Sequence, residues 1–520
     1  MPDVDALVIG AGHNGLVAAN MLAEQGWSVL VLEAADEPGG AVRSGELTEP
    51  GFTSDLFSSF YPLAAASPAI RALDLDITWR RSPLAVAHPQ PDGRCAVIST
   101  DVDETADSLA RFAPEDGDNW RSLYAYWERA GGPFMDALLR PFPPVRGAAR
   151  LARALGPRGL LEFARFGLLP VRRLAEERFA GEGAGWLLGG NALHADLTPE
   201  SAGGGLFGWV LCGLGQQYGF PVPEGGAARL VDALVARLRG HGGRLETGVR
   251  VSRIVIRRGR AVGVRTEDGR ELSAGRAVVA TTIAPTLYRD LVGEEHLPPR
   301  FVAGLRTFQL DNATVKVDWS LDGPIPWIAE DARRAGTLHI ADGMDALTRT
   351  SAQLSSGLLP DQPFLVMGQY SMVDPTRQPA GKETAWAYTH VPQGVQAWDA
   401  PETEAFAERI EAEVERRAPG FRSLIRKRHV FTPPAMQAAN SNLVGGAVNQ
   451  GTAQIHQQLV FRPTAGLGRA ETPVRHLYLA GASAHPGGGV HGAAGANAAR
   501  AALRPARTVS LAVTRALGRR

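Results

Sequence analysis

The first 32 residues alternate between short apolar runs and one helical pattern. Residues 6–9 are continuously apolar, residues 15–25 read as a helix, and residues 28–32 form a second, largely apolar run. Short apolar runs on either side of a helix are typical of buried parallel strands joined by a crossover. The chain therefore opens with a βαβ unit, half of a Rossmann-type domain.

The pattern of apolar positions changes further along the chain. From residue 82 to 219, apolar side chains recur at helical spacing, as at Trp120, Leu123, Tyr124 and Trp127, between Pro and Gly breaks. Later segments predict a helix at 228–239, strands at 249–257, 261–266 and 276–280, a strand at 476–480, and a helix that begins near His491. The elements of a dinucleotide-binding domain thus return twice.

These changes predict a domain built from separated pieces of chain. We expect the dinucleotide-binding domain at 1–81, 220–290 and 440–505, a substrate or cap domain at 82–219 and 291–439, and a C-terminal tail at 506–520.

Composition narrows the function classes. The 54 basic residues balance the 54 acidic ones, so no net field indicates nucleic acid as a partner. The two cysteines, Cys95 and Cys212, lie far apart, which excludes a disulfide scaffold, a C-x-x-C redox pair and a cysteine-based metal site. We expect no bound metal.

We expect a cytoplasmic protein that does not span a membrane. The N-terminus carries no signal-peptide pattern, and the longest apolar run, residues 202–215, is shorter than the ~20 residues of a membrane-spanning helix. Eight arginines lie among apolar residues between Arg146 and Arg178, which leaves open either peripheral contact with an anionic membrane or an ordinary solvated helix face. Residues 202–215 can form an apolar wall of a substrate tunnel or a plain core segment.

The strongest motif is the glycine turn after the first strand. Gly10, Gly12 and Gly15 form G-x-G-x-x-G, with His13 and Asn14 inside it. Gly10 permits the tight turn, Gly12 the approach of a pyrophosphate to the helix terminus, and Gly15 the packing of helix on strand. Glu33, 18 residues after Gly15, can accept hydrogen bonds from a ribose. This context predicts a nucleotide site, with His13 lining the cofactor channel.

A second glycine turn, with Gly39, Gly40 and Arg43, follows Glu33, and Arg43 can reach pyrophosphate or the flavin edge. The pairing resembles the extended FAD signature of the amine-oxidase and phytoene-desaturase superfamily. The resemblance continues at Val251, within the stretch where such proteins bind the adenine, and at Thr281 on their return strand. It implies a GR2-like, Rossmann-type α/β fold that binds FAD, interleaved with an α+β substrate-binding domain.

The C-terminal run from Leu477 to Gly492 resembles the closing flavin motif of carotenoid desaturases. The residues that the resemblance assigns to the cofactor are Gly481, Ala482, Gly488, Gly489 and Val490. Ala482 departs from the many superfamily members that carry an acidic residue there, so backbone donors must bind more of the cofactor. The opening motif, residues 440–451 and Arg462 resemble the branch that contains phytoene-desaturase-like proteins and the pyridine-nucleotide-disulfide-oxidoreductase-domain protein 2 group.

Lys316 is one of three lysines, against 51 arginines, and it interrupts an apolar strand. The resemblance implies the amine-oxidase lysine, which holds a water near flavin N5 and assists oxygen activation. The alternative is a lysine whose ammonium pairs with Asp318 or another acid. His485 and His491 flank the closing loop, and each can act as a general base or orient the cofactor.

We therefore expect an FAD-dependent oxidoreductase, a dehydrogenase or desaturase that abstracts hydride from a largely apolar, carotenoid-like or isoprenoid-like small molecule, with O2 or a quinone as electron acceptor. Three alternatives stay open: an amine-type flavin oxidase that uses O2, a redox-neutral flavin-dependent isomerase, and a non-catalytic flavin-binding interaction protein. The sequence does not identify the substrate or the oligomeric state.

Overall fold

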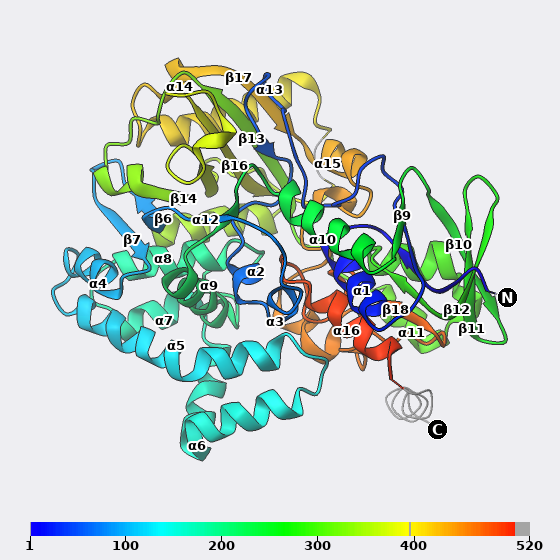
Figure 1. The fold of residues 1–520 in the computed structure, drawn as a ribbon. Coiled ribbons are helices and arrows are strands. Elements are labelled where there is room, and N and C mark those ends of the chain that lie inside the picture. The colour runs from blue at the N-terminus through cyan, green and yellow to red at the C-terminus, as the bar shows by residue number, and fades with distance from the viewer. Residues whose placement is uncertain (1, 395–396, 505–520) are drawn as a thin grey trace.

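A computed structural model describes residues 2–394 and 397–504. One of its two large sheets has β1 at its centre, and Figure 1 shows the sheet on the right of the molecule. Its parallel strands, in spatial order, are β9 (Arg244–Glu246), β2 (Val29–Leu32), β1 (Val4–Ile9), β12 (Glu271–Ala280) and β18 (Leu477–Leu479). The first half of β12 pairs with antiparallel β11 (Arg260–Thr266), which pairs with β10 (Val251–Arg257).

Both faces of this sheet are covered, as a parallel sheet requires. Ala6 and Val8 of β1 pack with helices α1 (His13–Glu24), α10 (Ala228–Gly240) and α16 (Ala493–Ala502). The alternate residues Leu7 and Ile9 belong to a different core on the opposite face. The apolar run of β1 therefore serves two cores at once.

The second large sheet lies on the upper left in Figure 1. Its spatial order is β17 (Ile425–Phe431), β13 (Ala313–Leu321), β16 (Glu383–Val391), β15 (Leu365–Gln369), β14 (Ala335–Ile340), β6 (Leu84–Pro89) and β7 (Cys95–Ser99). Neighbouring strands are antiparallel except for the β14 and β6 pair.

Strand β13 is buried along its whole length, yet its residues alternate in character. The odd-numbered residues Val315, Val317 and Trp319 join the core formed with α13 (Ala400–Glu415). Because successive side chains of a strand point to opposite faces, the polar residues Thr314, Lys316 and Asp318 share the other face.

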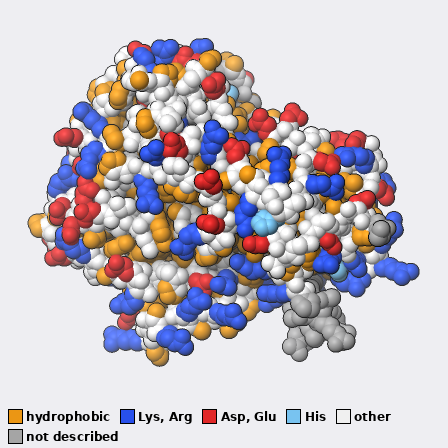
Figure 2. All heavy atoms as spheres, in the orientation of Figure 1, with side chains coloured by type: hydrophobic (Ala, Val, Ile, Leu, Met, Phe, Trp, Pro, Cys, Tyr) orange, Lys and Arg blue, Asp and Glu red, His pale blue; other side chains and the backbone are white. Residues whose placement is uncertain are grey.

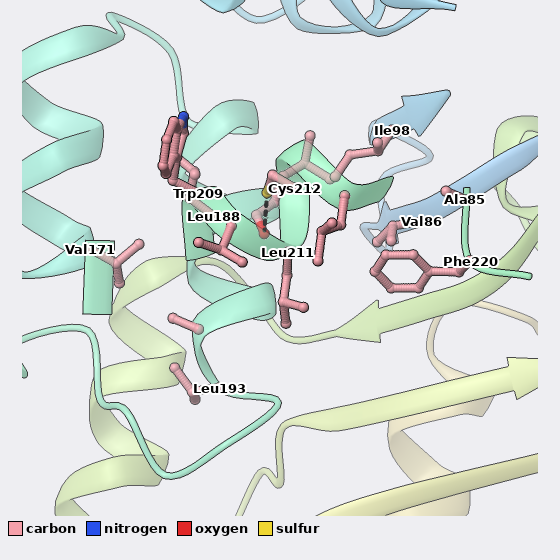
Figure 3. Close-up of a cluster of buried hydrophobic side chains, with 14 of the residues drawn as sticks. Ala85, Val86, Ile98, Val171, Leu188, Leu193, Trp209, Leu211, Cys212 and Phe220 are labelled. Carbon is pink, nitrogen blue, oxygen red and sulfur yellow. Dashed lines mark hydrogen bonds between the residues drawn. The ribbon is translucent and has the colours of Figure 1, made fainter. Parts of the chain in front are cut away.

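A helical lobe covers part of that other face. Its helices are α4 (Val102–Ala110), α5 (Asp116–Leu138), α6 (Val145–Leu168), α7 (Val171–Arg178), α8 (Gly183–Ala192) and α9 (Gly204–Tyr218). Figure 3 shows Trp209 and Leu211 on different sides of α9, with Cys212 between them on the helix. Trp209 is buried in the core of the lobe, where Phe163 and Phe166 pack against its ring.

Shorter elements connect these layers. The remaining helices are α2 (Pro62–Ala66), α3 (Pro68–Arg71), the π-helix η1 (Thr286–Val292), α11 (Pro299–Leu305), α12 (Met344–Ser355), α14 (Phe421–Leu424), α15 (Pro433–Ala439) and the 3-10 turns η2 (Glu294–His296), η3 (Glu330–Arg334), η4 (Pro375–Arg377), η5 (Val444–Gly446), η6 (Ile455–Gln457) and η7 (Leu459–Phe461). The remaining strands are β3 (Ser44–Gly45), β4 (Ser54–Asp55), β5 (Trp79–Arg80) and β8 (Val222–Pro223).

The predicted α/β fold with a Rossmann-type domain is confirmed, and each predicted strand and helix named above has its counterpart within a few residues. The domain boundaries stay a prediction, and the tail 506–520 lies outside the described residues. Within the described ranges, none of the helices combines the length and the apolar character needed to cross a membrane.

Candidate active site

One cavity runs between the two large sheets. Its volume is about 460 Å3, within the ~300–1,000 Å3 typical of small-molecule sites. The glycine-rich turns of the first sheet line one part of it. Strands β13, β14, β15 and β16 and helix α9 line the other part, through Lys316, Thr337, Val366, Trp386 and Phe207. A cofactor held by the glycine turns would therefore share one space with a substrate held on the second sheet.

The turn between β1 and α1 brings backbone to this cavity. Gly10 has a φ of 93°, which glycine adopts without steric cost, and a Cβ there would collide with Thr281 Oγ1. Gly12 is the N-cap of α1 and lines the cavity. Gly15 lies behind the turn, against Gly10 O. The positive end of α1 is thus open to an anionic group.

Glu33 lies at the end of β2 and lines the same part of the cavity. Its Oε2 accepts a hydrogen bond from Ala11 N at 2.7 Å, and its Oε1 accepts one from Ala35 N at 2.9 Å. These bonds fix the carboxylate at the cavity edge. Each oxygen keeps a second lone pair for a hydroxyl donor.

The second glycine turn packs against the first. Gly39 N donates to Ala11 O at 2.9 Å, and Gly40 lines the cavity. Arg43 does not line it: Arg43 Nη2 donates to Ala439 O at 2.8 Å, and its guanidinium lies 5.4 Å from the centre of the Phe57 ring. Its contact with pyrophosphate or flavin therefore stays a prediction.

The remaining predicted cofactor residues come together from the far end of the chain. Those that line the cavity are Val251, Thr281, Gly481, Ala482, Gly488, Gly489 and Val490. Strand β18 joins β12, so that Ala480 N donates to Ala280 O at 2.7 Å and the closing loop starts beside Thr281.

His13 and Asn14 line the cavity, and His13 Nε2 and Asn14 Oδ1 are buried without a hydrogen-bond partner among the described residues. Burial lowers the pKa of His13 to about 4, so its ring is neutral at pH 7.

His485 and His491 lie behind the closing loop, and neither lines the cavity. His485 Nε2 donates to Arg140 O at 2.9 Å, and His491 Nδ1 accepts from Ala493 N at 3.0 Å, at the start of α16. Burial lowers the pKa of His485 to about 4 and that of His491 to about 3. The contacts of both rings are those of residues that position the loop, and a role as general base stays a prediction.

Lys316 lines the cavity from β13. Its Nζ lies 2.5 Å from each carboxylate oxygen of Asp318, and the two side chains are 2% and 0% exposed. The ion pair left open by the sequence is therefore present. Burial raises the pKa of Asp318, and the ammonium of Lys316 opposes that rise. The Lys316 ammonium also lies 5.8 Å from the centre of the Trp386 ring.

Several cavity residues had no sequence motif. The segment 440–451 was used only to define the branch, but Asn442, Asn449 and Gln450 line the cavity, and Gln450 Oε1 accepts from Ala482 N at 3.1 Å. Phe207 and Leu211 of α9 line it too, whereas Trp209 does not. His194, interpreted as a satisfied polar residue, is another lining residue. We find no cluster of His, Cys, Asp or Glu suited to a metal ion in residues 2–394 and 397–504.

Residues 15–503 match the family model for flavin containing amine oxidoreductases, and the chain belongs to that family. It is similar to the mouse (Mus musculus) pyridine nucleotide-disulfide oxidoreductase domain-containing protein 2, at 27% identity over 97% of this chain and 94% of that protein. The lycopene-forming phytoene desaturase of Pseudescherichia vulneris is 26% identical over 96% and 98% of the two chains. Among solved structures, cyclohexylamine oxidase from Brevibacterium oxydans shares the fold, with a TM-score of 0.60 and 19% identity over 96% and 99% of the two chains.

The cofactor is FAD, because the family is flavin-containing and the β1 to α1 turn is built for a dinucleotide. The cavity fits such a group. Four buried polar atoms of lining residues have no partner among the described residues: His13 Nε2, Asn14 Oδ1, Thr282 Oγ1 and Asn449 Nδ2. Buried polar groups are rarely left unpaired, so these atoms indicate hydrogen bonds to a ligand.

Proposed function

We propose that this chain is an FAD-dependent dehydrogenase or desaturase that removes a hydride from a carbon of a largely apolar small molecule. When bound, FAD supplies the two-electron acceptor for that hydride. The observation that carries the proposal is the single cavity in which the glycine turns and the substrate sheet meet. Phe207, Leu211 and Phe220 give its second part apolar walls that exclude water and orient a carbon chain.

The relatives support this class of reaction. The phytoene desaturase relative belongs to a branch whose printed names include a limonene dehydrogenase subunit as well, at 23% identity. An isoprenoid-like substrate is therefore the substrate class that we propose. Loss of a hydride and a proton from adjacent carbons would leave a carbon-carbon double bond.

The test is anaerobic mixing of the purified holoenzyme with polyenes, isoprenoids, fatty-acyl compounds and amines, while flavin absorbance is followed. Bleaching by isoprenoids or polyenes, with a product two mass units lighter, is the expected result. Bleaching by amines alone would favour the amine-oxidase alternative, and an isomerised product of unchanged mass the redox-neutral one. A flavin that only dithionite reduces would support the non-catalytic alternative.

We propose O2 or a quinone as the electron acceptor, with Lys316 as the residue that decides between them. A lysine that holds a water for oxygen chemistry must be available to it, whereas the Lys316 ammonium is engaged by both oxygens of Asp318. Stopped-flow reoxidation of the reduced holoenzyme separates these roles. If Lys316 assists O2, Lys316→Met slows reoxidation by air but not anaerobic flavin reduction. Lys382→Met, which removes a lysine paired with Asp322 at the surface, is the matched control.

We also propose that α6 contacts an anionic membrane. Val145, Leu161 and Leu168 are 70%, 75% and 57% exposed on this helix, which also carries Arg146, Arg150, Arg153, Arg158 and Arg165 against the acidic Glu162. Figure 2 shows basic and apolar side chains together on this projecting part of the molecule. Exposed apolar side chains flanked by arginines bind anionic lipid surfaces.

Co-sedimentation with vesicles tests the membrane contact. The holoenzyme is expected to bind phosphatidylglycerol vesicles and to lose that binding in Leu161→Glu. Equal binding to phosphatidylcholine vesicles, or none to either, would contradict the proposal.

A further inference from the structure

The part of the cavity beyond the glycine turns has a polar row along the second sheet. Lys316 of β13 is opposite Tyr388 of β16, Tyr388 is opposite Val366 of β15, and Val366 is opposite His339 of β14. Adjacent strands lie ~4.8 Å apart, so three spacings put His339 roughly 14 Å from Lys316 along the sheet. The row therefore ends in a histidine at the far side of the cavity.

His339 is fully buried and contacts a second histidine. Its Nε2 lies 2.6 Å from Nε2 of His194, which follows α8 and lines the cavity. Burial lowers the pKa of His194 to about 3 and lowers that of His339 well below its usual value, so both rings are neutral at pH 7. Two neutral rings that share one hydrogen bond need one Nε2–H and one bare Nε2.

The surroundings of His339 decide which ring carries that proton. His339 Nδ1 is buried without a hydrogen-bond partner among the described residues, and it faces Gly190 of α8 so closely that a Cβ there would collide with it. An unpaired buried N–H is rarer in proteins than an unpaired acceptor. We infer that His339 Nδ1 is the bare nitrogen, and His339 Nε2–H donates to His194 Nε2.

The proton of His194 is then on Nδ1. This atom makes no hydrogen bond within the described ranges, yet it is not among the fully enclosed unpaired atoms, so it is open to the cavity that His194 lines. Its neighbours there include Phe220, whose ring centre is 6.3 Å from that of His194. Thr337, on the same strand and face as His339, adds a second unpaired polar atom, Oγ1, to this wall.

We propose that His194 Nδ1–H, held by His339, binds an oxygen acceptor on the substrate. The substrate class is then an oxygenated apolar chain, such as an alcohol, ether or ketone of isoprenoid type, and not a pure hydrocarbon. This proposal rests on the proposed function only in taking the second part of the cavity as the substrate site.

The test is a binding titration of the oxidised holoenzyme with three C15 chains: farnesene, farnesol and farnesyl methyl ether. Flavin absorbance changes or calorimetry report binding without turnover, so a failure here is distinct from a failure of flavin reduction. The ether accepts hydrogen bonds but cannot donate them. We expect ether and alcohol to bind about fivefold more tightly than farnesene, the gain of one hydrogen bond.

In His194→Phe this preference should disappear, while farnesene binding changes less than twofold. His390→Phe is the matched control: it removes a buried histidine that bonds Leu193 O and does not line the cavity, and it should keep the preference. An ether that binds no better than farnesene to the native protein would overturn the proposal.

Nitrogen-15 chemical shifts of labelled histidines test the protonation pattern without any ligand, and so cover the case in which a variant fails to fold. The expected signals are a protonated Nδ1 for His194 and a protonated Nε2 for His339. The reverse pattern would overturn the assignment of His194 as a donor.

Discussion

At the scale of single residues, Glu383 is a carboxylic acid whose charge the fold opposes. It begins β16 and is 1% exposed. Its Oε1 accepts from Tyr370 N and Ser371 N, both at 2.8 Å, and its Oε2 is bonded to the Ser371 hydroxyl. Burial raises the pKa of Glu383 to about 7. A protonated Glu383 can keep all three contacts, because its O–H can donate to Ser371 Oγ.

The raised pKa predicts a pH dependence of stability. Between about pH 4.5 and 7 the folded state holds a proton that the unfolded state has released, so the free energy of unfolding falls as pH rises through this window. The Glu383 share of that fall is up to about 3 kcal/mol. Glu383→Gln keeps an acceptor and a donor in place but does not titrate, so it should flatten the profile.

Urea unfolding of native and variant protein at pH 5 and pH 8, with saturating FAD, measures this share as a difference of differences. Other titrating groups are common to both proteins and cancel. Parallel pH profiles for the two proteins would show that Glu383 is ionised throughout this range.

At the scale of elements, α8 depends on glycine where it meets β14. An alanine is usually better than a glycine inside a helix by ~0.5–1 kcal/mol. At Gly190, however, a Cβ would collide with the His339 ring, whereas at Gly185 of the same helix the nearest side-chain atom would lie 3.4 Å away, in ordinary contact. Steric overlap should therefore reverse the usual gain at Gly190.

We expect Gly190→Ala to destabilise the protein by about 1–3 kcal/mol, the range for overpacked cores, and Gly185→Ala to be neutral or stabilising. Thermal unfolding of the two variants side by side measures both effects. Equal melting temperatures would mean that the His339 ring moves aside freely, and the hydrogen bond to His194 would then be weak.

The elements also differ in how well sequence predicts them. The β1, α1 and β2 unit was predictable because an apolar run, a glycine turn and an acid follow one another within 33 residues. The wall of the cavity was not: Lys316, His339 and Tyr388 meet only through pairing of β13, β14, β15 and β16, and His194 meets His339 across 145 positions. No local period encodes such long-range register. Strand β9, three residues long at a sheet edge, likewise carries too short a pattern.

At the scale of the whole molecule, a buried ionic cluster joins three distant segments. Arg377 is completely buried and contacts Asp55 at 2.7 Å and Asp374 at 2.9 Å, and its Nη2 donates to Pro223 O at 3.1 Å. Asp55 Oδ1 also accepts from Ala227 N at 2.8 Å, at the start of α10. Burial opposes ionisation of Asp55, but Arg377 outweighs it and holds the pKa of this carboxyl below its usual value.

Arg377→Met should therefore leave two buried carboxylates without their cation. We expect a loss of about 3–5 kcal/mol in the free energy of unfolding, measured by urea titration, together with weaker retention of FAD, since the cluster fixes the start of α10 behind the glycine turns. The control is Arg121→Met, which removes exposed ion pairs to Asp103 and Asp118 and should cost less than about 1 kcal/mol. Similar losses in the two variants would contradict the structural role of the cluster.

Strand β18 has a consequence for how the protein is made. It pairs with β12 from a position almost two hundred residues later in the chain, and the loop that follows it, 481–490, lines the cavity beside the opening glycine turn. During synthesis on the ribosome, the first turn emerges with the earliest residues but waits for this loop before its nucleotide site is whole. Translation at ~5–20 residues per second makes that wait tens of seconds. FAD is therefore captured late, by a nearly finished polypeptide, and the early glycine turn needs neighbouring helices to keep it folded until then.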